Sequence, residues 1–191
     1  MTTTTAAPAR PLRADARRNY DAIVRVASEA FTANGTQTSL DDIACKAGVG
    51  PGTLYRHFPT RDCLLAAALR DSLGELEKIS EELVTADEPG AALETWLFQL
   101  ATHLRTYGGL PDSVAQAFRS EESPLRTSCV PLRSITATLL ERAQHDGAAR
   151  ADASAGDVFA LVSSLAWAAD QRGDSDADLR RMLALVTDGL R

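Results

Sequence analysis

Cysteine, aromatic residues and long apolar runs are all scarce in this chain of 191 residues. The cysteines, Cys45, Cys63 and Cys129, are too few and too scattered for a disulfide framework, and no CxxC pair offers a metal site. No apolar run approaches the ~18 residues that a membrane-spanning helix needs. The start, MTTTTAAPAR, lacks the charged end and apolar stretch of a secretory signal. We therefore expect a cytoplasmic globular protein that holds neither a metal nor a cofactor and contacts no membrane.

Positive charge is also in the minority, but it is unevenly distributed. The chain has 20 Lys and Arg residues and 26 Asp and Glu residues. Residues 1–70 contain 9 of the basic residues and 6 of the acidic ones, so this part has a net charge of +3. The remainder carries −9, so the whole chain has a net charge of −6. Because the local sign of the charge decides which surface can approach phosphates, only the first part is suited to nucleic acid.

Alternating β-branched strand patterns are missing, whereas apolar residues recur at helical spacing almost everywhere. The pattern predicts an all-α protein of about nine helices. Pro131 is expected to kink the seventh of these helices or to separate its first turn from the rest. The helices are expected at about residues 20–31, 39–47, 51–58, 60–79, 93–107, 111–118, 124–144, 158–165 and 179–190.

Residues 39–57 contain two short helices joined by a glycine-containing turn. Ser39 is a plausible N-cap for the first of them, and Pro51 suits the first turn of the second. A longer helix precedes this pair, which is the arrangement of a helix-turn-helix. In such a unit the second helix lies in the major groove of DNA, and its N-terminal residues meet base edges.

The stretch from Ile23 to Leu65 resembles the DNA-binding domain of TetR-family transcriptional regulators. The matching features are AFTANG before the Thr and Ser that open the second helix, the IACKAGV turn, and the TLYRHF recognition helix followed by a charged helix start. The resemblance implies a sequence-specific DNA-binding regulator. By family default it is a repressor that a small-molecule ligand releases from its operator.

The resemblance also assigns roles to individual residues. Tyr55 matches a tyrosine that contacts backbone phosphate, and the residues up to Thr53 match base-reading positions, although Gly50, Pro51 and Gly52 have no side-chain donors. For Tyr55 and His57 a packing role remains open beside a DNA contact. The expected DNA-binding residues are Thr38, Ser39, Gly50, Pro51, Gly52, Thr53, Tyr55, Arg56, His57 and Arg61.

The C-terminal part resembles the family in architecture, and its second half resembles the SbtR-like subgroup. The resemblance implies a helical domain for ligand binding and dimerisation, with a palindromic double-stranded operator as the DNA partner. We expect a disordered arm at 1–14, a helix-turn-helix domain at 15–60, a connecting helix at 61–80 and the C-terminal domain at 81–191.

A cluster of aromatic and polar residues in this C-terminal domain suggests a pocket for an effector. Pockets in helical bundles are mostly apolar with a few placed polar groups. The alternative is that the aromatic residues simply fill the core and that His103 is a buried histidine whose hydrogen bonds are satisfied. The expected pocket residues are Trp96, Gln99, Leu100, His103, Tyr107, Phe118, Arg133 and Trp167.

The last two helices each carry an apolar stripe that we expect to pair across a two-fold axis in a homodimer. One short recognition helix contacts few base pairs, and a dimer doubles the site. The alternative is packing within the chain. The expected interface residues are Val158, Leu161, Val162, Leu165, Leu179, Met182, Leu183, Val186 and Leu190.

Other classes of function are less well supported. No P-loop, GxGxxG, GxSxG or HExxH motif is present, so nothing in the sequence favours an enzyme. An adaptor role would explain the helices but not the hydroxyl and cationic residues of the recognition helix. Cys63, near a helix N-terminus and Arg61, raises a redox-sensing hypothesis, against which stands the usual burial of cysteine as a small apolar residue.

Overall fold

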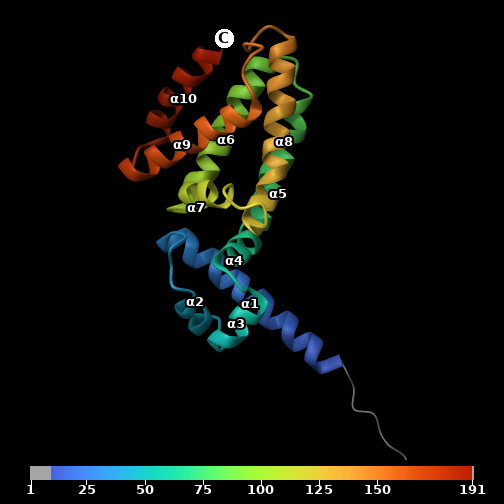
Figure 1. Cartoon of the computed structure of the whole chain (residues 1–191), viewed down its shortest axis with the longest axis vertical. Helices are drawn as coiled ribbons and strands as arrows, with labels where there is room; N and C mark the ends of the chain where they lie inside the picture. Colours follow the sequence, from blue (N-terminus) through green and yellow to red (C-terminus); the bar gives the residue numbers. More distant parts are fainter. Residues whose placement is uncertain (1–9, 191) are drawn as a thin grey trace, which may run out of the picture.

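The computed structural model describes residues 10–190 and forms ten helices with no strand among them (Figure 1). The all-α expectation is confirmed. Residues 1–9 of the expected disordered arm lie outside the described part, and the first helix already begins at Arg10. The helices are α1 (Arg10–Asn34), α2 (Leu40–Lys46), α3 (Pro51–His57), α4 (Arg61–Ala68), α5 (Arg70–Val84), α6 (Pro89–Thr106), α7 (Leu110–Ala117), α8 (Pro124–His145), α9 (Ala155–Arg172) and α10 (Asp176–Leu190).

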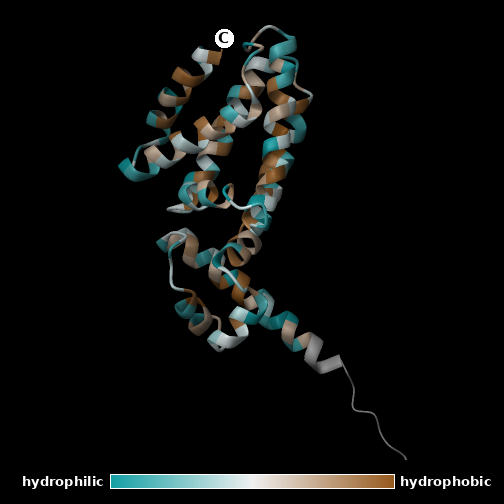
Figure 2. Cartoon of the chain, in the orientation of Figure 1, coloured by the Kyte–Doolittle hydropathy of each residue, from teal (hydrophilic) through white to brown (hydrophobic). Residues whose placement is uncertain are grey.

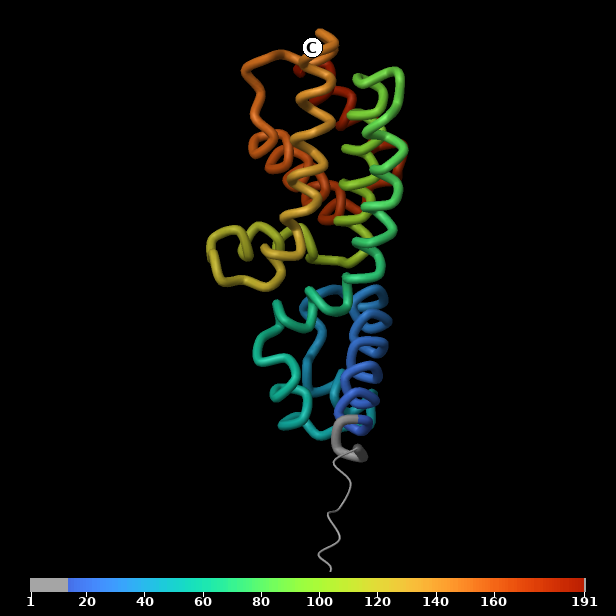
Figure 3. Tube along the Cα trace, turned by 90° about the vertical axis from the view of Figure 1, so that its right-hand side faces the viewer, coloured from blue at the N-terminus to red at the C-terminus, as the bar shows by residue number. Residues whose placement is uncertain are grey.

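Helices α1 to α4 form one end of an elongated molecule, and the later helices form the other (Figures 1 and 3). Ile23 and Phe31 of α1, Ile43 of α2 and Leu54 of α3 are all fully buried in the core of this end. Helix α4 packs against α1 and also against α8 of the larger part. It therefore connects the two ends of the molecule.

The fourth predicted helix is divided at Leu69 into α4 and α5, which accounts for ten helices rather than nine. The helical hydrogen bonds continue through this division. Leu69 donates its N–H to the carbonyl of Leu65 at 2.9 Å and accepts from Leu73 at 2.8 Å, and its side chain is buried. No glycine or proline marks this position, so the pattern of apolar residues did not reveal it.

Helix α6 is the centre of the larger part and packs against α5, α7, α8, α9 and α10. Trp96 of α6 is fully buried, and its indole Nε1 donates a 2.9 Å hydrogen bond to Thr136 Oγ1 of α8. Figure 2 shows apolar residues recurring turn by turn along the helices with polar residues between them. Helix α8 runs through Pro131 without being divided.

The described helices include none that is both long and apolar enough to cross a membrane. Within residues 10–190 no group of three or more His, Cys, Asp or Glu side chains is arranged to hold a metal ion.

Candidate nucleic-acid interface and cavity

Local sequence signals determine where α2 and α3 begin and how they meet. Ser39 caps α2 by accepting a 3.3 Å hydrogen bond from the amide of Asp42, and Asp41 and Asp42 lie in the first turn. The turn that follows contains Gly48 at a φ of +71°, a conformation that glycine adopts at little cost. Pro51 opens α3 with its fixed φ. The predicted helix-turn-helix is therefore present.

Helix α3 directs its polar residues away from the core. Leu54 is fully buried, whereas Tyr55 is 45% exposed and Arg56 is also exposed. Ahead of them, Gly50, Pro51 and Gly52 are exposed, and a Cβ added at Gly52 would meet no atom within 4 Å. The exposed start of α3 therefore has no side-chain hydrogen-bond donor, and Thr53, the next residue, is half-buried.

His57 lies in an aromatic cluster at the end of α3. Its ring centroid is 6.1 Å from that of Tyr20 and 6.2 Å from that of Phe58, and Tyr20 and Phe58 are 5.0 Å apart. The cluster joins the end of α3 to α1. The packing alternative therefore accounts for the position of His57, whereas Tyr55 does not share in this cluster.

Arg61 and Thr38, two of the expected DNA-binding residues, make hydrogen bonds within the chain. Arg61 Nη1 donates 2.7 Å hydrogen bonds to the carbonyls of both Thr36 and Thr38. The hydroxyl of Thr38 donates at 2.8 Å to the carbonyl of Gly35. A guanidinium suits this task because its rigid fork presents several donors. Both residues therefore hold the loop between α1 and α2, and their contact with DNA stays a prediction.

That loop touches the loop between α6 and α7, and sequence reasoning missed this contact. The amide of Thr36 donates a 2.7 Å hydrogen bond to the carbonyl of Gly108, and its hydroxyl lies 3.2 Å from that of Ser113. Gly35 has a φ of +80°, and a Cβ there would lie only 2.6 Å from Gly108 O. We call Gly35, Thr36, Gly108 and Ser113 the interdomain joint. The helix expected at about residues 93–107 ends just before Gly108, and no pattern in the sequence indicates this contact.

Helix α7, which follows the joint, is tied at both ends. Before it, the amide of Gly109 donates to Asp170 Oδ2 of α9 at 3.1 Å. After it, Ser123 Oγ donates a 2.7 Å hydrogen bond to Asp62 Oδ2 of α4. Ser123 also caps α8. Because Gly108, next to Gly109, accepts from Thr36, the segments on either side of α7 both contact the helix-turn-helix end of the molecule.

A cavity of about 680 Å³ lies between α7, α8 and α9. Its volume falls within the usual range of small-molecule sites. Most of its lining is apolar, with four polar residues among the lining set. The lining residues are Pro111, Asp112, Val114, Ala115, Phe118, Arg133, Gly156, Phe159, Ala160, Ser163, Ser164, Trp167 and Ala168.

The structure separates the eight residues expected to line a pocket. Three of them, Phe118, Arg133 and Trp167, line this cavity. Gln99 instead lines a hollow between α6 and α10. The prediction is wrong for the remaining α6 face because neighbouring helices cover it completely: Trp96, Leu100 and Tyr107 are buried in the core.

His103, on the same face of α6, is half-buried without a complete set of hydrogen bonds. Its Nε2 is buried and has no hydrogen-bond partner among the described residues, so the alternative of a histidine with satisfied hydrogen bonds is not supported. Burial lowers the pKa of the imidazole below its ordinary 6.5, although the charge of Glu75 opposes this effect. His103 is therefore held in its neutral form more strongly than a free histidine.

The expected dimer stripe is mostly covered by the chain itself. Val158, Val162 and Leu179 are almost or fully inaccessible, and Leu183 and Leu190 are also buried. The predicted interface is therefore wrong for these five residues, because their side chains face inward and belong to the core. Leu165, Met182 and Val186 are half-buried against it.

The apolar residues exposed on α9 and α10 are different ones. Leu161 is 48% exposed and Leu185 is 74% exposed. Both line a shallow groove with Val186 and Gly189, beside the charged side chains of Arg150 and Asp152. Of these two exposed leucines, Leu161 belongs to the expected interface, whereas Leu185 lies one position off the main apolar stripe and was not expected there.

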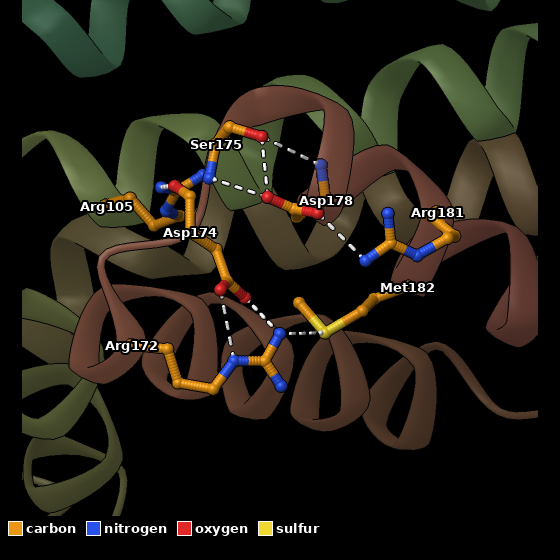
Figure 4. Close-up of polar contacts among 7 residues, drawn as sticks. All are labelled: Arg105, Arg172, Asp174, Ser175, Asp178, Arg181 and Met182. Atoms are coloured by element: carbon orange, nitrogen blue, oxygen red, sulfur yellow. Dashed lines mark hydrogen bonds and ion pairs between the residues drawn. The ribbon is translucent and has the colours of Figure 1, made fainter.

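The turn from α9 to α10 is held by polar contacts (Figure 4). Arg172 pairs with the carboxylate of Asp174, and Arg105 of α6 donates to the carbonyl of Asp174. Ser175 caps α10 together with Asp178, which accepts a 2.7 Å hydrogen bond from the Ser175 hydroxyl. That bond and Arg181 lower the pKa of Asp178 to about 2. The crossing of α9 and α10 is thereby constrained.

Comparison with known proteins supports the geometry. Residues 23–68 match the model of bacterial regulatory proteins of the tetR family, and residues 88–191 match the C-terminal domain of SbtR-like transcriptional regulators. The HTH-type transcriptional repressor KstR2 of Mycolicibacterium smegmatis is 26% identical over 174 residues, which cover 84% of this chain and 81% of the repressor.

Solved structures agree in fold. A TetR transcriptional regulator from Streptomyces coelicolor is 33% identical, with a TM-score of 0.58, over 90% of this chain and 97% of that one. The regulator FadR from Bacillus subtilis, solved in complex with stearoyl-CoA, is 18% identical with a TM-score of 0.65. The match covers 90% of this chain and 97% of FadR. Together with the helix-turn-helix geometry, these matches establish that the chain belongs to the TetR family of transcriptional regulators.

Proposed function

We propose that this chain acts as a homodimeric repressor. It binds a two-fold DNA operator through α3 and leaves the operator when a small molecule enters the cavity between α7, α8 and α9. The repressor role is supported by the similarity to KstR2, whose name describes it as a transcriptional repressor. The effector role is supported by the cavity and by the fold shared with FadR, which was solved with stearoyl-CoA.

The observation that carries the DNA-binding proposal is the division of α3 into a buried and an exposed side. Leu54 anchors the helix, while Tyr55 and Arg56 are exposed, and neither side chain makes a hydrogen bond or ion pair with another described residue. Phenol and guanidinium groups are donors that phosphate and base edges accept. Arg56 and Tyr55 are therefore available to DNA, together with the exposed Ser39 and the glycines that open α3.

Dimerisation is supported by the exposed leucines. Leu161 and Leu185 belong to neighbouring helices and line one groove, so a second copy related by a two-fold axis can cover the same patch on both chains. The polar contacts of Asp174 and Asp178 stabilise the turn between α9 and α10, the two helices that carry these leucines.

Coupling between effector and DNA is supported by the attachments of α7. This helix forms one wall of the cavity, and the segments before and after it bond to Thr36 and Asp62 in the helix-turn-helix end. A ligand that moves α7 would move these contacts. Release requires that the ligand favour a dimer in which the two α3 helices are wrongly spaced, since equal affinity for both states shifts nothing.

The experiment that tests this function begins with selection of bound DNA from a random pool. Fluorescence anisotropy then compares the wild type with Tyr55→Phe and Arg56→Ala on the selected operator. Arg119→Ala removes an exposed arginine far from α3 in the chain and serves as the control. Weaker binding of both α3 variants supports the proposal, whereas binding as tight as wild type by both would contradict it.

A further inference from the structure

The polar side chains that line the cavity differ in whether they already form hydrogen bonds within the chain. They are Asp112 of α7, Arg133 of α8, and Ser163 and Ser164 of α9. Each serine donates its hydroxyl hydrogen to a carbonyl of its own helix, Ser163 to Phe159 and Ser164 to Ala160, both at 2.8 Å. The serines therefore offer a bound molecule only acceptor oxygen atoms.

Asp112 is also engaged. Its carboxylate accepts a 3.0 Å hydrogen bond from Gln116 Nε2, and it lies in the first turn of α7, where the helix dipole favours negative charge. The carboxylate therefore has a hydrogen-bond donor within the helix that carries it.

Arg133 is the exception among these groups. Its side chain is exposed, and no hydrogen bond or ion pair joins its guanidinium to another described residue, Asp112 included. Its central carbon lies 5.2 Å from the centre of the Phe118 ring. A cation over a ring face is held in position by the ring quadrupole, so this guanidinium stands at the cavity wall with its donors available.

The N-terminal turn of α9 lies beside this guanidinium. A Cβ added at Gly156 would be 3.5 Å from Arg133 Nη2, so the missing side chain leaves the backbone of α9 close to the cation. Gly156 is the second residue of an 18-residue helix and lines the cavity. The positive end of a helix dipole and an arginine together favour an anion.

The rest of the cavity is suited to an apolar body. The rings of Phe118 and Phe159 meet edge to face with centroids 5.7 Å apart, and Trp167 lies on the same lining at 48% exposure. Aromatic walls of this kind bury large apolar area.

Building on the proposed effector role of this cavity, we propose that its ligand is an amphipathic anion. The apolar chain or ring system lies against Phe118, Phe159 and Trp167, and the carboxylate or phosphate group pairs with Arg133 beside the start of α9. Arg133 is then the residue that selects anionic over neutral or cationic ligands.

The test uses four probes with one twelve-carbon chain: dodecanoate, dodecan-1-ol, dodecylamine and dodecanoyl-CoA. Binding to the full-length protein is followed through intrinsic tryptophan fluorescence, to which the cavity residue Trp167 and the buried Trp96 both contribute, at probe concentrations below micelle formation. Dodecanoate and dodecanoyl-CoA distinguish a carboxylate head group from a phosphate-bearing one. Arg133→Gln removes the cation from the cavity, and Arg119→Gln removes one charge from an exposed residue that is not part of the lining.

The expected result is that at least one of the two anionic probes binds and that Arg133→Gln weakens this binding about tenfold, since a hydrogen bond to a charged group contributes on that scale. Arg119→Gln leaves the affinity unchanged. Equal binding of dodecan-1-ol or dodecylamine, no effect of Arg133→Gln, or no binding of any probe would overturn the assignment. Operator anisotropy of the same samples without probe tests the regulator role separately, so the two proposals can fail independently.

Discussion

The amide of Thr36 and the carbonyl of Gly108 form a 2.7 Å hydrogen bond between two loops that lie far apart in the sequence. One loop precedes α2 of the helix-turn-helix, and the other precedes α7, a wall of the cavity. The contact is between backbones, because Gly35 leaves no side chain between them. It therefore depends on the position of the loops rather than on the chemistry of a side chain that can adapt.

Gly35→Ala should damage this joint. The added Cβ would lie 2.6 Å from Gly108 O, and the φ of +80° is unfavourable for alanine. We expect the free energy of unfolding to fall by about 1–3 kcal/mol in urea titrations. Gly74→Ala is the matched control, since Gly74 lies inside α5 with open space around it and should tolerate or gain from alanine. Equal stability of the two variants would contradict the role given to the joint.

Arg61→Lys should destabilise the protein although it keeps the positive charge. An ammonium group on a flexible stem does not reproduce a guanidinium that holds the carbonyls of Thr36 and Thr38 at 2.7 Å each. We expect a loss of about 1–3 kcal/mol in the free energy of unfolding. A variant that is as stable as wild type but binds DNA less tightly would contradict this role and favour a direct contact between Arg61 and DNA.

Arg56→Ala should have the opposite profile. Arg56 is exposed, so the free energy of unfolding should change by only a few tenths of a kcal/mol. If Arg56 contacts phosphate, all DNA sequences lose affinity alike, and the slope of log affinity against log salt decreases by about one. If it reads a base, specificity relaxes at one operator position. Anisotropy titrations at several salt concentrations distinguish these two outcomes.

Leu161→Glu combined with Leu185→Glu should yield folded monomers. Both side chains are exposed, so the charges disrupt a surface rather than the core. Leu183→Glu is the contrasting variant: it places a carboxylate at a buried position and should reduce helicity and stability. Light scattering and circular dichroism measure the two effects. A wild-type protein that is monomeric at micromolar concentration would remove the dimer from the proposal.

Acidification should destabilise the protein through His103. Its pKa in the folded state lies below the ordinary 6.5, so on falling pH the unfolded chain takes up a proton before the folded one does. The stabilisation is present above 6.5 and is lost as the pH falls from that value to the folded pKa. Urea titrations from about pH 8 to about pH 5 should show this loss in the wild type and a smaller one in His103→Gln. Identical pH profiles would contradict the assignment.

Much of the fold was predictable because helix ends carry local signals. Ser39 caps α2, Pro51 opens α3 and Gly48 turns between them, and each acts through its own backbone preference. The break at Leu69 was not predictable, since the helical hydrogen bonds continue through it and no residue type marks it.

Residue types and their spacing determined the helices, the helix-turn-helix and the outward position of Tyr55 and Arg56, because these depend on neighbours along the chain. Tertiary structure decided which surface covers each apolar stripe. Leu183 faces the core and Leu185 faces outward, although periodicity indicates only that α10 has an apolar face. Arg61 and Thr36 acquired their roles from carbonyls and loops that folding brings to them, and no local pattern records such distant contacts.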